Sequence, residues 1–456
     1  MRVTILLNKT IIATLMLMAF VFGGCNNSGK TSEQTDEKKN DSVSSEMATD
    51  SKITIIAEPQ CPKRGTLFFD KSSSMRGYME SSNDSRFYGA IASLVNLANV
   101  DSCCFYGEKE EKGIDKESFD DLLNKRDIKW SGESDIKSMI ASMIEHINKK
   151  GDDICLLVTD GILSGSNEDI KNSPDRSYNI THREQLSHNI AALFEKESVE
   201  MSALIIRYEA KFNTSPKPNM KGGWYYYCYN NDQKIINNQD RPFFIIAMGK
   251  LEYVKYLENA LNKAIAENKL NESVSLKIST PTDIVLFGEN FDIYENIKLS
   301  YSEGIKTEPK NPNLLIIKSE YRKDGMVSLT ADISTLPLYM QSLEFMNNNI
   351  EITIQHGQKN AKLLANEYRE FSVDEVNGKT ILKISIKASQ LKDSRLTCEL
   401  KYSLPKWIGT KSDDNDLNIL ENPLKMGKTF NFWYLIKGFE ALQKDKTVNK
   451  QSLEFK

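Results

Sequence analysis

The sequence predicts an α/β domain with a mostly parallel sheet, followed by an antiparallel β-sandwich. From residue 64 to 267, short continuous apolar runs alternate with segments whose apolar residues have helical spacing. This alternation is typical of strands buried on both faces and of the helices that cover them. Past about residue 268 the helical spacing stops, and short runs alternate inward-facing and outward-facing residues. A chain of 456 residues is long enough for roughly two to four domains.

The amino-terminal segments are predicted to lie outside the folded domains. Two basic residues precede an apolar run over residues 11–22, and two glycines then lead to Cys25. The apolar run is too short to span a hydrocarbon core of about 30 Å, whereas a charged start and a small-residue end are typical of a secretory signal. We interpret residues 1–24 as a signal peptide. Residues 25–52 contain almost nothing to bury, which predicts a disordered tether.

Residues 53–272 are predicted to form the α/β domain. Its apolar runs show no alternation with polar residues, so they are read as buried strands, and apolar residues at three- and four-residue steps mark helices. Sheets of parallel strands usually bind ligands at the carboxyl ends of the strands, so we look for functional residues there. The predicted order is strand 66–69, helix 87–98, strand 103–106, helix 136–147, strand 153–159, helix 186–194, strand 201–207, strand 243–248 and helix 253–264.

Residues 273–405 are predicted to form the β-sandwich, for which an immunoglobulin-like arrangement is one option. Residues 406–456 form a carboxyl-terminal extension, in which residues 428–439 are predicted to be a helix whose aromatic side chains pack on the body. The expected sandwich strands are residues 274–279, 297–301, 327–331, 350–354, 381–386 and 396–400.

Composition argues against several classes of protein. The chain has 59 Lys and Arg against 63 Asp and Glu, whereas a nucleic-acid binder would carry a basic surplus. No C-x-x-C, nucleophile-elbow or glycine-rich nucleotide-binding pattern occurs. Cys104 and Cys155 lie in strand-like runs, where a cysteine is usually a small buried hydrophobe. No metal-ligand spacing relates the histidines, which are expected to be surface or packing residues: His146, His182, His188 and His356.

Polar side chains with metal-binding chemistry cluster near the ends of predicted strands. A D-x-S-x-S pattern follows the first strand directly and precedes a helix. An aspartate follows the strand that ends at residue 159, and a serine lies in a loop just before another helix. These five candidate ligands are Asp70, Ser72, Ser74, Asp160 and Ser134.

This set resembles the metal-ion-dependent adhesion site (MIDAS) of von Willebrand factor type A (VWA) domains and integrin I domains. The family also uses a Thr on the second loop, and Ser134 takes the place of that residue. The resemblance spans about residues 62 to 267. It implies a Rossmann-like VWA domain, a bound Mg²⁺ ion (or Mn²⁺ or Ca²⁺), and a protein ligand that supplies an acidic side chain to the ion.

The chemistry of these residues suits such an ion. Magnesium prefers about six oxygen ligands at roughly 2.0–2.1 Å and keeps several waters. Asp70 and Asp160 would balance its charge, and the serine hydroxyls would add neutral oxygens. The alternative is a serine-rich turn that caps the following helix, with Asp70 as a buried acceptor.

The residues before Cys25 resemble the lipobox of bacterial lipoproteins, with Phe22 where a smaller aliphatic residue is more usual. That resemblance implies acylation of Cys25 and a lipid anchor in the bacterial cell envelope, on the periplasmic side or at the cell surface. The alternative is an ordinary signal peptide with an incidental cysteine.

Three functions are compatible with these observations. The leading hypothesis is a membrane-anchored, extracytoplasmic binding protein whose VWA domain holds a divalent cation and grips a carboxylate of a protein ligand. A metal-dependent hydrolase at the same site would need a general base, for which only Glu133, Asp135 or Asp153 is available. The third is a structural component of the envelope.

Overall fold

The computed structural model describes the body of the chain with internal gaps. None of the described helices is both long enough and apolar enough to cross a membrane. The expected signal peptide and tether, including Cys25, lie outside the described residues. The described residues are 58–80, 84–131, 135–163, 180–196, 200–215, 236–270, 280–288, 294, 297–323, 325–362, 369–413, 425, 427–443 and 447–456.

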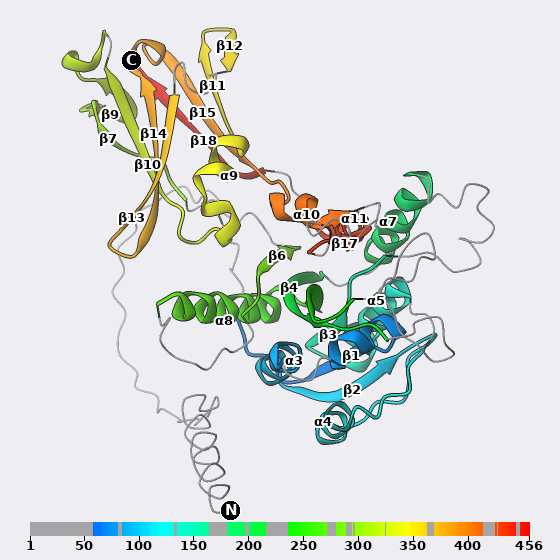
Figure 1. Cartoon of the computed structure of the whole chain (residues 1–456). Helices are drawn as coiled ribbons and strands as arrows, with labels where there is room; N and C mark the ends of the chain where they lie inside the picture. Colours follow the sequence, from blue (N-terminus) through cyan, green and yellow to red (C-terminus); the bar gives the residue numbers. More distant parts are fainter. Residues whose placement is uncertain are drawn as a thin grey trace, which may run out of the picture. The chain divides into compact units, whose positions relative to one another are not determined.

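A six-stranded sheet forms the centre of the α/β part (Figure 1), and its strand order is β2-β1-β3-β5-β4-β6. β1 is parallel to both of its neighbours, β2 and β3. β5 is antiparallel to β3 and β4, and β6 is antiparallel to β4. The sheet is therefore mixed, with β1, β2, β3 and β4 in one direction. The strands are β1 (Gly65–Asp70), β2 (Val100–Tyr106), β3 (Ile154–Thr159), β4 (Ser202–Phe212), β5 (Gln239–Gly249) and β6 (Asp283–Phe287).

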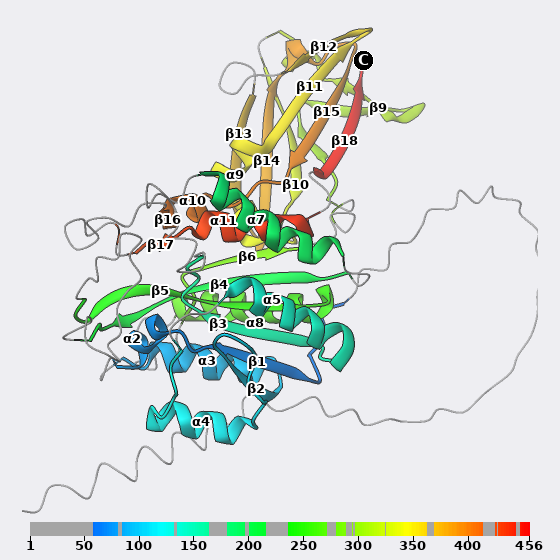
Figure 2. The same cartoon turned by 90° about the vertical axis from the view of Figure 1, so that its right-hand side faces the viewer.

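The prediction of a mostly parallel sheet holds for the half around β1, and the reversal at β5 has a physical reason. Parallel neighbours need a crossover connection, usually a helix, whereas neighbours joined without one pair in antiparallel fashion. The sequence predicted no helix between these two strands. β4 and β5 pair along their full length, from Ser202 with Gly249 to Phe212 with Gln239, and Figure 2 shows them side by side. β6 extends the sheet beyond the expected boundary at residue 272.

Helices cover both faces of this sheet because successive side chains of its strands point to opposite sides. Leu67 and Phe69 of β1 belong to a core shared with α3, α4 and α8, whereas Phe68 belongs to a core shared with α5 and α7. The predicted helices are present. They are α3 (Arg86–Leu97), α5 (Ile136–Glu145), α7 (Ile180–Glu195) and α8 (Leu251–Leu270). The structure adds two helices that were not predicted, the short α2 (Arg76–Met79) after β1 and α4 (Lys116–Lys125).

The second part is a sandwich of two sheets with one shared apolar core. One sheet has the order β13-β14-β10-β7 and the other β12-β11-β15-β18-β9-β8. All pairs are antiparallel except β18 with β9. The strands are β7 (Ser300–Glu303), β8 (Ile305–Glu308), β9 (Asn311–Ile317), β10 (Met326–Asp332), β11 (Ile350–His356), β12 (Lys359–Lys362), β13 (Arg369–Val376), β14 (Lys379–Lys387), β15 (Ser394–Lys401) and β18 (Thr447–Phe455), with α9 (Leu343–Asn349) before β11. The strand expected at residues 274–279 lies outside the described residues.

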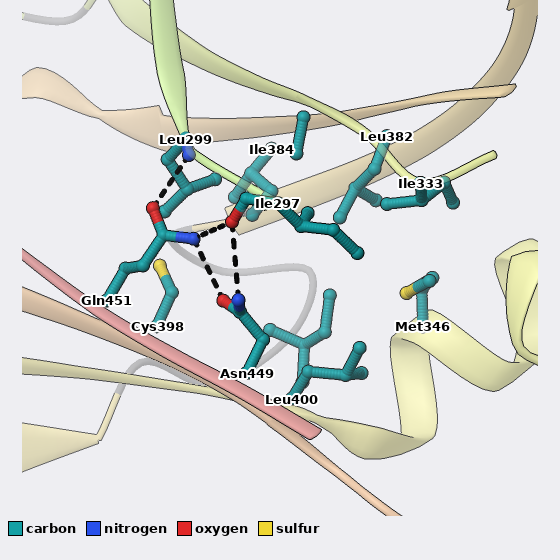
Figure 3. Close-up of a pocket in the computed structure, with 12 residues that line it drawn as sticks. Ile297, Leu299, Ile333, Met346, Leu382, Ile384, Cys398, Leu400, Asn449 and Gln451 are labelled. Carbon is teal, nitrogen blue, oxygen red and sulfur yellow. Dashed lines mark hydrogen bonds between the residues drawn. The ribbon is translucent and has the colours of Figure 1, made fainter. Parts of the chain in front are cut away.

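A cavity of about 40 Å³ lies within the sandwich core. Figure 3 shows aliphatic side chains around it, with Asn449 and Gln451 of β18 at one side. Gln451 accepts a hydrogen bond from the backbone N of Leu299 at 2.7 Å, and Asn449 donates to the carbonyl of Ile297 at 3.3 Å. The two amides thereby fix the segment before β7, and the remaining wall is apolar.

The carboxyl-terminal extension contributes to both parts. The predicted helix is present as α11 (Phe432–Phe439), and it belongs to the same core as α5 and α7. The Phe432 ring stacks on Phe244 of β5 with centroids 4.3 Å apart. After α11 the chain adds β18 to the sandwich. The remaining short elements here are α10 (Lys406–Lys411), β16 (Ser412–Asp413), β17 (Thr429–Phe430) and the 3₁₀ turn η8 (Glu440–Leu442).

Candidate metal site

Two aspartates meet at the carboxyl ends of β1 and β3. These strands are parallel neighbours, with Phe69 opposite Val158, so their ends lie at the same edge of the sheet. Asp70 is the last residue of β1, and Asp160 follows β3 directly. The exposed fractions are 1% for Asp70 and 5% for Asp160. The sheet register therefore places two buried carboxyl groups side by side.

The two serines of the D-x-S-x-S pattern join these carboxyl groups. Ser74 Oγ donates a hydrogen bond to Asp160 Oδ2 at 2.6 Å, and it lies 3.1 Å from Ser72 Oγ. The backbone N of Ser72 donates to Asp70 Oδ1 at 2.8 Å. The structure thus brings together four of the five candidate ligands through a connected set of hydrogen bonds.

Thr159 is a further member of the site to which the sequence analysis gave no role. Its buried hydroxyl donates to Asp70 Oδ2 at 2.9 Å and accepts from the backbone N of Gly161 at 3.2 Å. The backbone N of Ile162 donates to Asp160 Oδ1 at 3.1 Å. Thr159 therefore orients the Asp70 carboxyl group. The available signal was a hydroxyl residue at the end of a strand that otherwise consists of apolar residues.

The second loop begins beside the D-x-S-x-S motif. The backbone N of Ser131 donates a hydrogen bond to the carbonyl of Lys71 at 2.8 Å. The carbonyl of Ser131 accepts a hydrogen bond from Ser73 Oγ, also at 2.8 Å. Ser134 and Glu133 follow within three residues but lie outside the described part of the chain. Ser131 is thus the described residue that links this loop to the motif.

The other two proposed general bases have different partners. Asp135 caps α5, because it accepts hydrogen bonds from the backbone N of Lys137 at 3.1 Å and from Ser138 Oγ at 2.6 Å. Asp153 lies before β3, at the opposite end of that strand from Asp160. It accepts from the backbone N of Lys63 at 2.7 Å. Asp153 is therefore not part of the candidate metal site.

Burial and charge repulsion both act on Asp160. Burial is the larger cause and the nearby Asp70 charge the second, and together they raise the pKa of Asp160 from 3.8 to about 7. The hydrogen bond from Ser74 and the charge of Arg241 act in the opposite direction. A cation between the carboxyl groups would remove the repulsion. The site is therefore electrostatically suited to a cation.

The helix-cap interpretation finds partial support. Asp70 does accept a bond from the backbone two residues later, as a turn aspartate would. However, neither the short 3₁₀ turn η1 (Ser73–Met75) nor α2 has a side-chain cap at its amino end. The hydroxyls of Ser72 and Ser74 instead face each other and Asp160, so capping does not account for them.

Comparison of this chain with models of known protein families, with curated proteins and with solved structures gives no match. The assignment of a function therefore depends on the chemistry of the site.

Proposed function

We propose that this chain is a binding protein that uses a divalent cation, held by a VWA-like domain, to grip a carboxylate of a protein ligand. The observation that supports this most directly is the contact of Ser74 with Asp160. It joins a motif at the end of one strand to an aspartate at the end of its neighbour. Asp70, Ser72, Ser74 and Asp160 would face the ion, and Ser134 would complete the set from the second loop.

Magnesium is the ion that fits this donor set best. All the candidate donors are oxygen atoms, and two of them belong to carboxylates that would balance the charge of the ion. Magnesium is often held by one or two carboxylates while it keeps several waters. One of those waters can be replaced by an acidic side chain from outside. Mn²⁺ and Ca²⁺ also accept oxygen donors and are the natural substitutes in an experiment.

The anchor is a separate component of the proposal, and it rests on the sequence alone. Acylation of Cys25 after removal of residues 1–24 would attach the body to the bacterial cell envelope through the tether expected at residues 25–52. A lipid anchor and a ligand-binding domain together suit a protein that captures its partner in the periplasm or at the cell surface.

A hydrolase is the second candidate, and the described residues favour it less. Asp153 lies at the other end of β3 and cannot activate a water at this ion, and Asp135 is engaged in capping α5. Glu133 remains as a base. A third candidate is an envelope component in which the ion only stabilises the fold.

The test combines Mg²⁺ titration with a peptide pair. An ion that binds only the folded state at about 100 times its Kd adds roughly 2.7 kcal/mol to the free energy of unfolding. We expect the full chain to melt at higher temperature with Mg²⁺. It should then bind a peptide that carries one Glu and not the same peptide with Gln. Asp70→Ala should lose both effects, Ser134→Thr should keep them, and Asp121→Asn on α4 is the charge-matched control.

Each alternative gives a different result. Absence of a Mg²⁺-dependent shift in the wild type would overturn the metal site itself. A shift without discrimination between the Glu and Gln peptides would leave a purely structural ion. Cleavage of a phosphoester or peptide that depends on Mg²⁺ and on Glu133 would establish the hydrolase.

A further inference from the structure

A second cluster of metal-ligand side chains lies at the opposite end of β3 from Asp160. His146 begins η2 (His146–Lys150), a π-helical turn that continues α5, Asp152 lies in the turn before β3, and Cys155 is in β3 itself. One ligand atom from each residue lies within 4.8 Å of the others, and all three residues are buried. The expectation that His146 is merely a surface or packing residue therefore misses its polar partners.

The contacts converge on Asp152. Its Oδ2 atom lies 3.0 Å from His146 Nδ1 and 3.9 Å from Cys155 Sγ, and it accepts a hydrogen bond from Thr66 Oγ1 at 2.6 Å. Its other oxygen, Oδ1, lies 3.0 Å from Arg64 Nε. The Asp152 carboxylate is thus held in place by Thr66 of β1 and by Arg64, the residue before β1. His146 Nδ1 and Cys155 Sγ both face Oδ2.

We propose that His146 Nδ1, Asp152 Oδ2 and Cys155 Sγ bind a divalent transition-metal ion of the zinc class. This proposal is independent of the function proposed above. Zinc is commonly bound by imidazole, thiolate and carboxylate, at about 2.0–2.3 Å. A tetrahedral ion with such bonds holds its ligand atoms roughly 3.3–3.8 Å apart. The separations of 3.0 and 3.9 Å lie just outside that range, and the remaining pair of ligand atoms lies within 4.8 Å, so the side chains would have to move together to close the site.

The surroundings of His146 strengthen the assignment. Its second ring nitrogen, Nε2, lies 2.9 Å from Glu110 Oε1. Histidines that bind metals through one nitrogen commonly donate the other N–H to a carboxylate, which fixes the tautomer and the ring orientation. The edge-to-face contact with Phe68, with centroids 4.9 Å apart, further restrains the ring. Glu110 and Phe68 are therefore positioning residues.

Lys150 must adjust when the ion binds. Its Nζ atom lies 2.6 Å from His146 Nε2 and 3.2 Å from Glu110 Oε1. When Nδ1 binds the ion, Nε2 carries the ring proton. Lys150 Nζ and His146 Nε2 would then both be hydrogen-bond donors and could not bond to each other. The Lys150 side chain is about half exposed and can turn away from the ring while keeping its ion pair with Glu110. The competing interpretation is a metal-free network of charges around His146, built from the same contacts.

The two sites differ in donor chemistry. The cluster at the amino end of β3 contains sulfur and nitrogen, which favour zinc-class ions, whereas the site at the carboxyl end offers oxygen donors, which favour magnesium. Loss of one site therefore does not predict loss of the other, and each can be probed with its own ion.

Cobalt titration of the full chain tests the proposal. We expect one equivalent of Co²⁺ to give a thiolate-to-cobalt charge-transfer band and the visible bands of a tetrahedral ion, both removed by one equivalent of Zn²⁺. Cys155→Ser should abolish the charge-transfer band, whereas Cys398→Ser, a buried thiol in the sandwich, should leave it unchanged. Glu110→Gln should weaken binding about 10–100-fold without removing the band. Asp160→Asn should have no effect on it.

The wild-type spectrum alone can overturn the proposal, even if a variant fails to fold. No charge-transfer band at one equivalent of Co²⁺ would show that the cluster is a metal-free charge network. Retention of the band in folded Cys155→Ser would place the ion at another thiol and have the same consequence. Circular dichroism of each variant confirms that the comparison is made between folded proteins.

Discussion

At the scale of single residues, Asp160 and Asp332 show how opposite environments change the pKa of a carboxyl group in opposite directions. Burial and the charge of Asp70 raise the pKa of Asp160 to about 7. Hydrogen bonds from Lys379 and Ser334 lower the pKa of Asp332 to about 2. An ion-free protein therefore loses stability from Asp160 as the pH rises from about 4 through 7, because the folded state holds that proton longer. Asp332 stabilises the fold above its unfolded pKa, and this contribution is lost as the pH falls toward 2.

Asp160→Asn should therefore stabilise the ion-free protein at pH 8 more than at pH 5, and it should also abolish the Mg²⁺-dependent increase in melting temperature. Melting curves in chelator at the two pH values measure the first effect. Asp332→Asn is the matched control, since it removes one carboxylate that is already ionised at both pH values. An equal change at pH 5 and pH 8 for Asp160→Asn would show that the buried carboxyl group does not titrate in this interval.

At the scale of elements, the sequence predicted the strands and helices around the candidate site well. Continuous apolar runs and helical spacing identified β1, β3, α3 and α5, and the position of Asp70 and Asp160 after strands predicted that they would meet. The direction of β5 could not be obtained from its composition, because an apolar strand is equally suited to parallel or antiparallel pairing. The polar contacts of His146 were missed because Glu110, one of its partners, lies 36 residues away in the sequence.

The sandwich core offers a prediction at the scale of elements. Ala331 of β10 and Leu400 of β15 both line the cavity of about 40 Å³. Ala331→Val adds two methyl groups toward that space and suits a strand, so we expect a gain of up to about 1 kcal/mol in the free energy of unfolding. Leu400→Ala enlarges the cavity and should cost about 2–5 kcal/mol. Urea denaturation measures both, and a destabilising Ala331→Val would show that the cavity cannot accept a branched side chain.

At the scale of the whole molecule, the chain does not divide cleanly at residue 272. β6 adds to the α/β sheet after that point, and the segment between β15 and β18 packs against one face of the same sheet. Arg241 of β5 donates to the carbonyl of Lys428 at 3.2 Å, and Asn431 donates to the carbonyl of Leu163 at 3.0 Å. With the stacking of Phe432 on Phe244, these contacts make the carboxyl-terminal extension part of the α/β core.

A fragment of residues 53–272 should therefore fail to reach the stability of its counterpart within the full chain. It would expose to water the apolar surface that α11 covers, and Arg241 would lose the carbonyl groups of Lys425 and Lys428 as hydrogen-bond partners. We expect aggregation, or a state with secondary structure but no cooperative melting. Phe432→Ala in the full chain is the milder test, and it should lower stability by about 3–5 kcal/mol while leaving a folded protein. A soluble 53–272 fragment with a cooperative transition and wild-type Mg²⁺ binding would contradict this view, because the α/β core would then be complete without the extension.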